Sequence, residues 1–251
     1  MKIRTDFVTN SSSSSYIFKE YDKKSFVKAA LEGLEKFLAK EGSEYELEWL
    51  EDWFGKDYKK GYSSAVKYMF SEIHPIQKCS IEELSYILCF FDCEICEILL
   101  NGTEHFIRSG RHCENKDHYR KILSGPLSEQ IQEKIAGYIA AVYMADDYYD
   151  DFQRTEDTVF SESVLYEYMM PKLYNEISDY FDRMAYSNYI EYYGDNILEH
   201  LKKYVGLTAG EIAAKLFGNV YVYFDDLETH YLYGDVFQEM PICILGCNHM
   251  G

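Results

Sequence analysis

Several cysteines and histidines near the middle of the chain have side chains suited to binding a metal ion. Cys93 and Cys96 are separated by two residues, and His112, Cys113 and His118 follow. Thiolate sulfur and imidazole nitrogen are the ligands that Zn²⁺ prefers in a tetrahedral site. One hypothesis is therefore a zinc site, whose ligands would come from Cys93, Cys96, His112, Cys113 and His249.

The same cysteines also fit a purely structural role. Cys89, Cys93 and Cys96 recur at helical spacing, as i, i+4 and i+7, which places them on one face of a helix. Cysteine packs well in a core as a small apolar side chain. Because the chain has no second Cys-x-x-Cys pair, the sequence favours core packing over a metal site, and no cofactor is expected.

A thiol-dependent enzyme is a second chemical alternative. Cys113 lies beside His112, and a neighbouring imidazolium lowers the pKa of a thiol, whose thiolate is the nucleophile. Adjacent residues of a strand, however, point to opposite faces and rarely reach one another. A metal- or thiol-dependent enzyme therefore stays the alternative, and the sequence favours a protein without catalytic activity.

Known catalytic motifs give little further support for an enzyme. Residues 223–226 read Tyr-Phe-Asp-Asp, which is similar to the Y-x-D-D turn of reverse transcriptases, where carboxylates hold catalytic Mg²⁺. A polymerase also needs a basic template channel, which this sequence lacks, so Asp225 and Asp226 are interpreted as turn residues. The chain contains no G-x-G-x-x-G, Walker A, H-E-x-x-H or G-x-S-x-G motif.

The net charge is the most unusual property of the chain. Its 251 residues include 25 Lys or Arg and 43 Asp or Glu, a formal net charge of −18. With 47% hydrophobic residues, 25 of them Tyr, the chain has enough apolar surface to fold around a core. A surface this acidic repels the phosphate backbone, so direct nucleic-acid binding is not expected.

The acidity is concentrated in the second half of the chain. Residues 143–195 contain 13 Asp or Glu, 3 Lys or Arg and 11 Tyr, and residues 216–251 contain no Lys or Arg. Carboxylates interleaved with aromatic rings can imitate phosphates and stacked bases. The residues expected to bind a partner in this way are Asp146, Asp147, Tyr148, Tyr149, Asp150, Asp151, Asp179, Asp182, Tyr192 and Tyr193.

These residues lead to a specific functional hypothesis. We expect an acidic, Tyr-rich protein-binding module that occludes a basic, nucleic-acid-handling partner, as an anti-defence inhibitor of the anti-CRISPR type would. The simpler interpretation is a solvated helix face, with the tyrosines as core and boundary residues. A cation site at 146–151 has less support, because the segment lacks the Gly turn and distal Glu of an EF-hand loop.

Targeting signals and cysteine number bear on the compartment. The N-terminus lacks the apolar region of a signal peptide, and no apolar run is long enough to span a membrane. Seven cysteines in a large chain are typical of free thiols rather than of a disulfide framework. A cytoplasmic protein that does not bind membranes is expected.

The first ninety residues predict strands followed by helices. Short β-like runs flank the polar stretch 9–15, and from Asp22 apolar residues recur at helical spacing through Leu38. Ser43 with Glu46, and Ser80 with Glu83, match the capping box that begins a helix, and Gly55 is a stop signal for the first of these helices.

The remainder predicts more helix and a final β-like end. Residues 101–118 predict a hairpin or functional loop. Gly125-Pro126 predicts the start of a helix, with helical structure continuing to about Tyr204 and broken at Pro171. Thr208 with Glu211 forms another capping box, Gly218 a helix end, and residues 220–224 a strand.

Together these patterns predict an α+β fold. The helical middle spans about 22–217, and the β-like ends span 1–18 and 219–245. We expect the N- and C-terminal segments to form one small sheet in a mostly helical protein. No linker or repeat divides the chain, so a single domain over 1–251 is expected.

The opening MKIRTDFVTNSSSSSYIF resembles an N-terminal signature of uncharacterised proteins of gut Firmicutes and their mobile elements, in which DFVTNSSSSS precedes an aromatic residue. The last residues, Cys247-Asn-His-Met-Gly251, are similar to terminal tails of some of these proteins. The resemblance covers about 18 residues and implies no activity, cofactor or catalytic residue.

The serine tract allows three interpretations. It could be a substrate of serine modification, a hydroxyl-rich loop that binds an anion, or a solvated connection between strands. The tract consists of Ser11, Ser12, Ser13, Ser14 and Ser15. If the two chain ends meet in one sheet, the tract would lie near Cys247 and His249.

Overall fold

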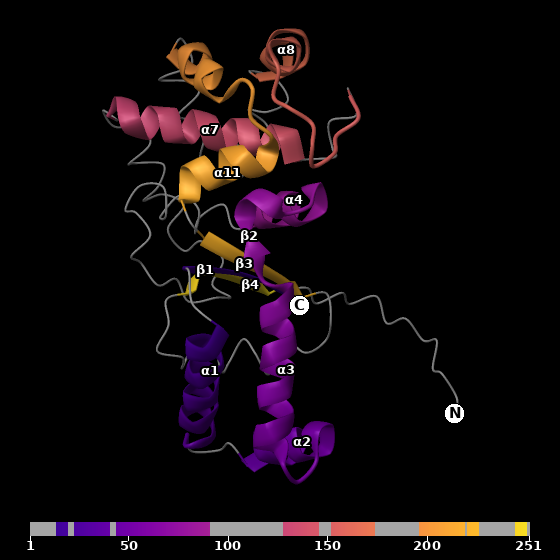
Figure 1. Cartoon of the computed structure of the whole chain (residues 1–251). Coiled ribbons are helices and arrows are strands. Elements are labelled where there is room, and N and C mark those ends of the chain that lie inside the picture. Colours follow the sequence, from indigo (N-terminus) through magenta and orange to yellow (C-terminus); the bar gives the residue numbers. More distant parts are fainter. Residues whose placement is uncertain are drawn as a thin grey trace.

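The computed structural model describes residues 14–19, 23–40, 44–90, 128–145, 152–173, 196–218, 220–225 and 244–249. The elements are labelled as in Figure 1, with η for a 3-10 or π helix. In chain order they are β1 (Ser14–Lys19), α1 (Lys23–Leu38), α2 (Glu44–Phe54), α3 (Tyr58–Glu72), β2 (His74–Pro75), η1 (Ile76–Lys78), α4 (Ile81–Phe90), α7 (Glu129–Ala145), η2 (Val164–Met169), α8 (Met170–Lys172), η4 (Lys202–Tyr204), α11 (Ala209–Phe217), β3 (Val220–Asp225) and β4 (Ile244–His249).

A four-stranded sheet lies between two groups of helices. Its strand order is β2-β3-β1-β4, and all three pairings are antiparallel. Helices α1, α2 and α3 lie on one side of the sheet, and α4, α7 and α11 lie on the other (Figure 1). The β1–β4 pairing contains one register shift, between Ile17 and Phe18.

The alternation of β3 explains how one sheet serves both groups of helices. Val220 and Val222 belong to the apolar cluster of α4, α7 and α11, which we call the α7 core. Tyr221 and Tyr223 contact the cluster of α1, α2 and α3, which we call the α1 core. Because successive side chains of a strand point to opposite faces, β3 contributes to both cores at once.

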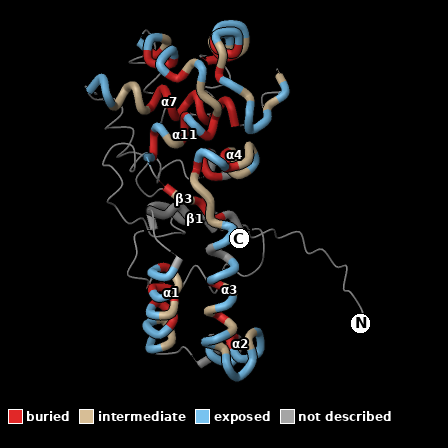
Figure 2. The backbone as a smooth tube through the Cα atoms, in the orientation of Figure 1, coloured by how far each residue is buried: buried red, intermediate tan, exposed pale blue. Residues whose placement is uncertain are grey.

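The α1 core is formed by the apolar faces of three helices. The fully buried side chains of Phe26 and Leu34 on α1 pack with Leu50 on α2 and Val66 on α3. The burial pattern in Figure 2 follows one stripe of each helix, as expected for amphipathic helices at the surface. The helix predicted from Asp22 to Leu38 is confirmed for Lys23–Leu38.

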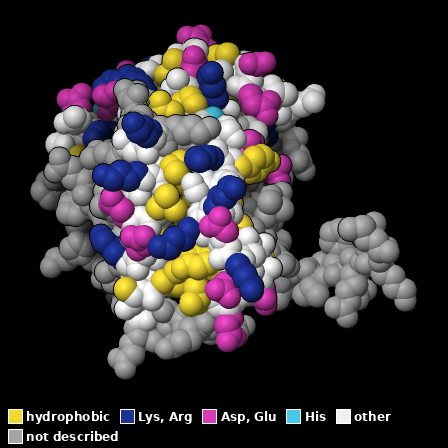
Figure 3. Space-filling view, turned by 60° about the horizontal axis from the view of Figure 1, so that its bottom comes forward, with side chains coloured by type: hydrophobic (Ala, Val, Ile, Leu, Met, Phe, Trp, Pro, Cys, Tyr) yellow, Lys and Arg dark blue, Asp and Glu magenta, His cyan; other side chains and the backbone are white. Residues whose placement is uncertain are grey.

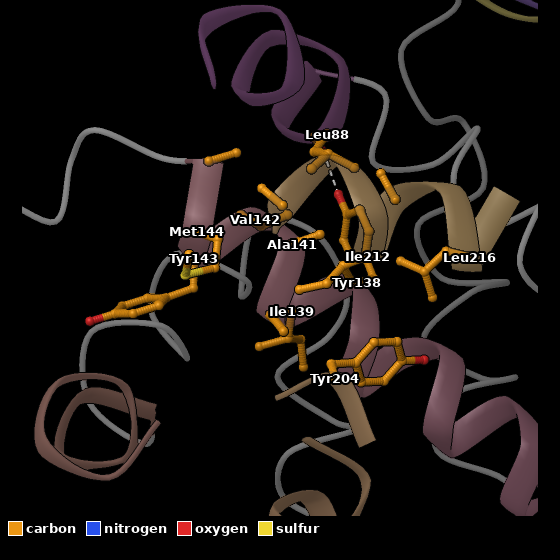
Figure 4. Close-up of a cluster of buried hydrophobic side chains, with 14 of the residues drawn as sticks. Leu88, Tyr138, Ile139, Ala141, Val142, Tyr143, Met144, Tyr204, Ile212 and Leu216 are labelled. Atoms are coloured by element: carbon orange, nitrogen blue, oxygen red, sulfur yellow. Dashed lines mark hydrogen bonds between the residues drawn. The ribbon is translucent and has the colours of Figure 1, made fainter. Parts of the chain in front are cut away.

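The α7 core is built around the C-terminal part of α7, which is buried on every side. Every residue from Ile135 to Ala145 is buried, whereas the sequence pattern predicted only one apolar face. Ala136, Gly137, Ala140 and Ala141 occupy the other faces, and their small side chains let neighbouring elements approach closely. Across this core the buried hydroxyl of Tyr138 donates a hydrogen bond to the backbone carbonyl of Leu88 (Figure 4).

The predicted capping boxes and glycine helix ends are confirmed where they fall on described residues. The backbone N–H of Glu83 donates to Oγ of Ser80 at 3.1 Å, and the N–H of Ser80 donates to Oε2 of Glu83 at 2.7 Å. Thr208 and Glu211 form the second reciprocal capping box. Gly55 and Gly218 end their helices with φ of 76°, a conformation that favours glycine.

Two predictions for the segment 152–173 are wrong. Residues 152–161 are not helical: they form turns, and Val159 pairs with Thr208 in an isolated bridge. Pro171 does not break its helix but lies in α8, directly after the π-helical η2. There the N–H of Met170 bonds to the carbonyl of Leu165, five residues back, so the helix accommodates the proline by widening.

The general fold prediction is confirmed: the protein is mostly helical and has a small antiparallel sheet. The predicted strand at 220–224 is confirmed as β3, one of the two inner strands of the sheet. Residues 1–13 and 226–243, which complete the predicted β-like ends, lie outside the described residues. Among the helices that the structure describes, none is both long and apolar enough to cross a membrane.

Candidate functional site

Most of the predicted site residues lie outside the described part of the chain. This holds for the whole set expected to bind a partner, for most of the alternative metal ligands and for three serines of the tract. The set consists of Asp146, Asp147, Tyr148, Tyr149, Asp150, Asp151, Asp179, Asp182, Tyr192, Tyr193, Cys93, Cys96, His112, Cys113, Ser11, Ser12 and Ser13. Their roles stay predictions.

The sheet register relates the remaining predicted residues through the backbone. Ser14 is paired with His249 on β4 and with Asp225 on β3, so its backbone lies between these two strands. Ser15 is paired with Asn248, and Tyr16 with Cys247. Ser14 and Ser15 therefore lie on β1 beside β4.

On the described helices, acidic and basic side chains occur together. The side chains of Lys28 and Glu32 are 3.5 Å apart, and those of Lys59 and Glu35 are 2.9 Å apart. Apolar side chains, lysines and carboxylates are interspersed on the face that contains α1, α2 and α3 (Figure 3). This face does not carry charge of a single sign.

The other group of helices has the same character. Glu133 on α7 accepts from Lys203 at 2.8 Å and lies 3.9 Å from Lys215, and Lys202 donates to Glu199 at 2.7 Å. Burial of these groups is slight, so each pair contributes little to stability. Their effect is to neutralise local charge, and the described residues contain almost as many Lys and Arg as Asp and Glu.

The described residues contain one cluster of side chains that could hold a metal ion. His74 is the first residue of β2, Cys79 follows η1, and Glu83 lies in the first turn of α4. One ligand atom of each residue lies within 4.8 Å of the others. The three residues come from a segment of ten, in which a short strand, a 3-10 turn and a helix start fold back on themselves.

Local structure fixes each member of this cluster. β2 pairs with β3 through His74 and Val222, which places the histidine at the edge of the sheet. The N–H of Cys79 donates to the carbonyl of Ile76 at 3.2 Å and closes the 3-10 turn. The capping box with Ser80 holds the carboxylate of Glu83 at the start of α4.

The imidazole of His74 contacts an acceptor on both sides. Its Nδ1 lies 2.8 Å from the backbone carbonyl of Glu72, and its Nε2 lies 3.2 Å from Oε2 of Glu83. A carbonyl oxygen can only accept, so Nδ1 carries a hydrogen and donates. The side chains of His74 and Glu83 are 28% and 21% exposed, so solvent reaches the cluster from one side.

The electrostatics of the cluster follow from these contacts. The hydrogen bond to Glu83 raises the pKa of His74 above its ordinary value, although burial opposes this shift. Burial alone would raise the pKa of Glu83, but hydrogen bonds from His74 and Ser80 outweigh it and hold this pKa below its ordinary value. Burial strongly raises the pKa of the Cys79 thiol, so without a cation the sulfur is protonated.

These pKa shifts distinguish nucleophilic catalysis by Cys79 from metal binding by the cluster. A protonated, buried thiol is a poor nucleophile, so Cys79 does not resemble the activated cysteine of an enzyme. Sulfur, imidazole nitrogen and carboxylate oxygen are nevertheless a donor set that suits zinc. The arrangement can bind a proton or a cation between His74 and Glu83.

No family model, curated protein or solved structure matches this chain. Its chemistry is therefore interpreted from its own residues.

The cluster of His74, Cys79 and Glu83 is not predicted from the sequence, although one part of it, the capping box, is. Ser80 and Glu83 are correctly predicted as a capping box, but that role alone gives Glu83 no further function. His74 and Cys79 precede the box by six residues and one residue. The contact of His74 with Glu83 depends on the short strand and 3-10 turn, which apolar periodicity does not reveal because both are too short.

Proposed function

We propose that the protein is an acidic, Tyr-rich binding module that occludes a basic partner, a protein of a nucleic-acid-processing complex, without itself binding nucleic acid. The observation that carries the proposal is the segregation of charge along the chain. The described residues together hold 17 Lys or Arg and 20 Asp or Glu, whereas the stretches 146–151 and 174–195, which lie outside them, hold 9 Asp or Glu and 1 Arg. Much of the excess acidity is therefore concentrated in part of the sequence.

The ion pairs of the described helices sharpen this contrast. Glu35, Glu133 and Glu199 each lie within 3 Å of a lysine nitrogen. The acid-rich segment 143–195 itself contains 3 Lys or Arg, and residues 216–251 contain none. Carboxylates that the chain does not neutralise attract a basic surface on another protein and accelerate its association.

Tyrosines supply the second part of the proposed mechanism. Aromatic side chains bury large areas at low entropic cost and are enriched among residues that dominate binding energy. Of the 11 Tyr of 143–195, Tyr143 is buried in the α7 core and Tyr168 packs against it, whereas Tyr166 is exposed. Elsewhere in the segment tyrosines are interleaved with carboxylates in the sequence, as at Tyr148-Tyr149-Asp150-Asp151. Such a surface would occupy a groove that normally binds phosphates and bases, in the manner of an anti-defence inhibitor.

We also propose where the protein acts and which part of the fold holds this surface. A cytoplasmic location fits a partner that handles nucleic acid. The two chain ends, residues 1–18 and 219–245, are proposed to form the small sheet together, and the pairing of β1 with both β3 and β4 supports this arrangement. The acid-rich segment would then be held by the helical middle of a single domain.

The test is capture of a partner from a host lysate at low salt by the tagged full chain. The first variant reverses four charges in the proposed surface: Asp146→Lys, Asp147→Lys, Asp150→Lys and Asp151→Lys. The control reverses four exposed carboxylates on different helices: Glu32→Lys, Glu48→Lys, Glu72→Lys and Glu82→Lys.

Both variants change the net charge equally. A difference between them would therefore depend on where the charges lie and not on the total charge. We expect the wild type and the control to retain one basic protein that the first variant loses. Recovery of no basic protein by the wild type, or equal loss by both variants, would contradict the proposal.

A further inference from the structure

We propose that His74, Cys79 and Glu83 form a binding site for a divalent cation of the zinc type. The site is separate from the acid-rich surface and from the alternative ligands Cys93, Cys96, His112 and Cys113. It combines one nitrogen, one sulfur and one oxygen donor at the junction of β2, η1 and α4.

The hydrogen bonds of His74 provide the first argument. Nδ1 donates to the carbonyl of Glu72, so a neutral imidazole presents a lone pair at Nε2. That lone pair faces Oε2 of Glu83, which already accepts the N–H of Ser80. Two acceptors 3.2 Å apart repel unless a positive charge lies between them, and this charge is either a proton or a metal ion.

The hydrogen bonds around His74 and Glu83 are also those expected around two metal ligands. Histidines that bind metals through one nitrogen commonly donate the other N–H to a carbonyl or carboxylate, which fixes the ring. Here the carbonyl of Glu72 does so for His74, and the N–H of Ser80 orients the carboxylate of Glu83. Both ligands are thus held before a cation binds.

The distances agree with tetrahedral coordination. Zinc–nitrogen and zinc–oxygen bonds of about 2.0 Å and a zinc–sulfur bond of about 2.3 Å place ligand atoms roughly 3.3–3.5 Å apart. Nε2 and Oε2 are 3.2 Å apart, and all three ligand atoms lie within 4.8 Å of one another. Side-chain movements of about 1 Å would complete the site around an ion of this size.

A close backbone contact holds the turn that joins the ligands. A Cβ atom at Gly210 would lie 2.6 Å from the carbonyl oxygen of Gln77, so only glycine lets α11 pack this tightly on η1. The 3-10 turn between His74 and Cys79 is therefore fixed from outside. Cys79 is 3% exposed, which places its sulfur on the inner side of the site.

The donor set selects the class of cation. Ca²⁺ and Mg²⁺ require several oxygen ligands, whereas a cysteine sulfur and an imidazole favour zinc and related transition metals. Three protein ligands leave a fourth position, and the partial exposure of His74 and Glu83 lets water occupy it. Cation binding would displace the protons from Nε2 of His74 and from Sγ of Cys79.

Titration of the metal-free full chain with Co²⁺ tests the proposal, because cobalt replaces zinc and reports a bound thiolate through its charge-transfer absorption. We expect one Co²⁺ per chain with that absorption, and displacement of the cobalt by Zn²⁺. Cys79→Ser should abolish the charge-transfer absorption. Glu83→Gln should weaken binding by about 100-fold or more, since a first ligand matters at least as much as its supporting contacts.

Glu83→Gln also guards against a folding artefact. Glutamine can take the place of glutamate in a capping box, so this variant retains the start of α4 while losing the charged ligand. The matched control is Cys93→Ser/Cys96→Ser/Cys113→Ser, which should bind Co²⁺ like the wild type. Absence of the absorption in the wild type, or its persistence in Cys79→Ser, would overturn the assignment.

Discussion

Nε2 of His74 lies 3.2 Å from Oε2 of Glu83, the same oxygen that accepts the backbone N–H of Ser80 at 2.7 Å. One carboxylate oxygen therefore links the edge of the sheet to the start of α4. Along the chain, these two elements are joined by the η1 turn.

The first prediction concerns the contribution of Glu83 to stability. Glu83→Ala should lower the free energy of unfolding by about 2 kcal/mol, because it removes the carboxylate that accepts the N–H of Ser80 and leaves Nε2 of His74 without its acceptor. Urea denaturation measures this change. The control is Glu82→Ala in the same helical turn, whose exposed side chain should contribute less than about 0.5 kcal/mol. Equal losses would contradict the role of the contact.

Gly210 gives a prediction whose sign is informative. Gly→Ala in a helix ordinarily stabilises it by up to about 1 kcal/mol. At Gly210, however, the new Cβ would lie 2.6 Å from the carbonyl oxygen of Gln77, so Gly210→Ala should destabilise the protein by about 1–3 kcal/mol. Thermal unfolding decides between the two, and a raised melting temperature would show that α11 does not pack against η1 in this way.

His200 should make the protein sensitive to mild acid. Burial, aided by the charge of Lys203, lowers its pKa below the ordinary value of 6.5. The unfolded chain therefore binds a proton at this position that the folded chain resists, and the contribution of His200 to stability falls as the pH drops below about 6.5. The raised pKa of His74 contributes with the opposite sign, so the comparison of variants isolates His200. Urea denaturation at pH 7.5 and pH 5.5 should show a smaller loss in His200→Gln than in the wild type. The same loss in both would exclude His200 as its source.

Thr208 provides a test of the second capping box. Its hydroxyl accepts the N–H of Glu211 at 3.3 Å, and Glu211 returns the contact to the N–H of Thr208 at 2.9 Å. Thr208→Ala should cost about 1 kcal/mol of unfolding free energy, and Thr208→Ser, which keeps the hydroxyl, much less. Chemical denaturation of the two variants measures the difference, and equal stabilities would argue against the cap.

Local signals in the sequence predict much of the fold. Capping residues and terminal glycines mark the start of α4 and both ends of α11, because these features depend on hydrogen bonds within a few residues. The burial of α7 on all sides is not predictable in this way. It depends on which elements surround the helix, and the small residues between its apolar positions give no periodic signal.

The site shows the same division between local and long-range information. Glu83 is predictable as a capping residue, but its contact with His74 requires β2 to pair with β3, which lies about 150 residues further along the chain. The π-helical turn before Pro171 is similar: proline predicts an interruption, whereas the observed helix widens and continues through α8. Neither outcome follows from residue spacing alone.

The central claim is that the acid-rich segment 143–195 binds a basic partner. Its most direct test is the dissociation constant for the captured basic protein, measured by calorimetry at increasing salt concentrations. We predict that affinity falls steeply with salt for the wild type and for the control variant with reversed charges at Glu32, Glu48, Glu72 and Glu82. Reversal of the charges at 146–151 should remove most of the affinity at low salt. An affinity that does not change with salt, or that survives this reversal, would contradict the account.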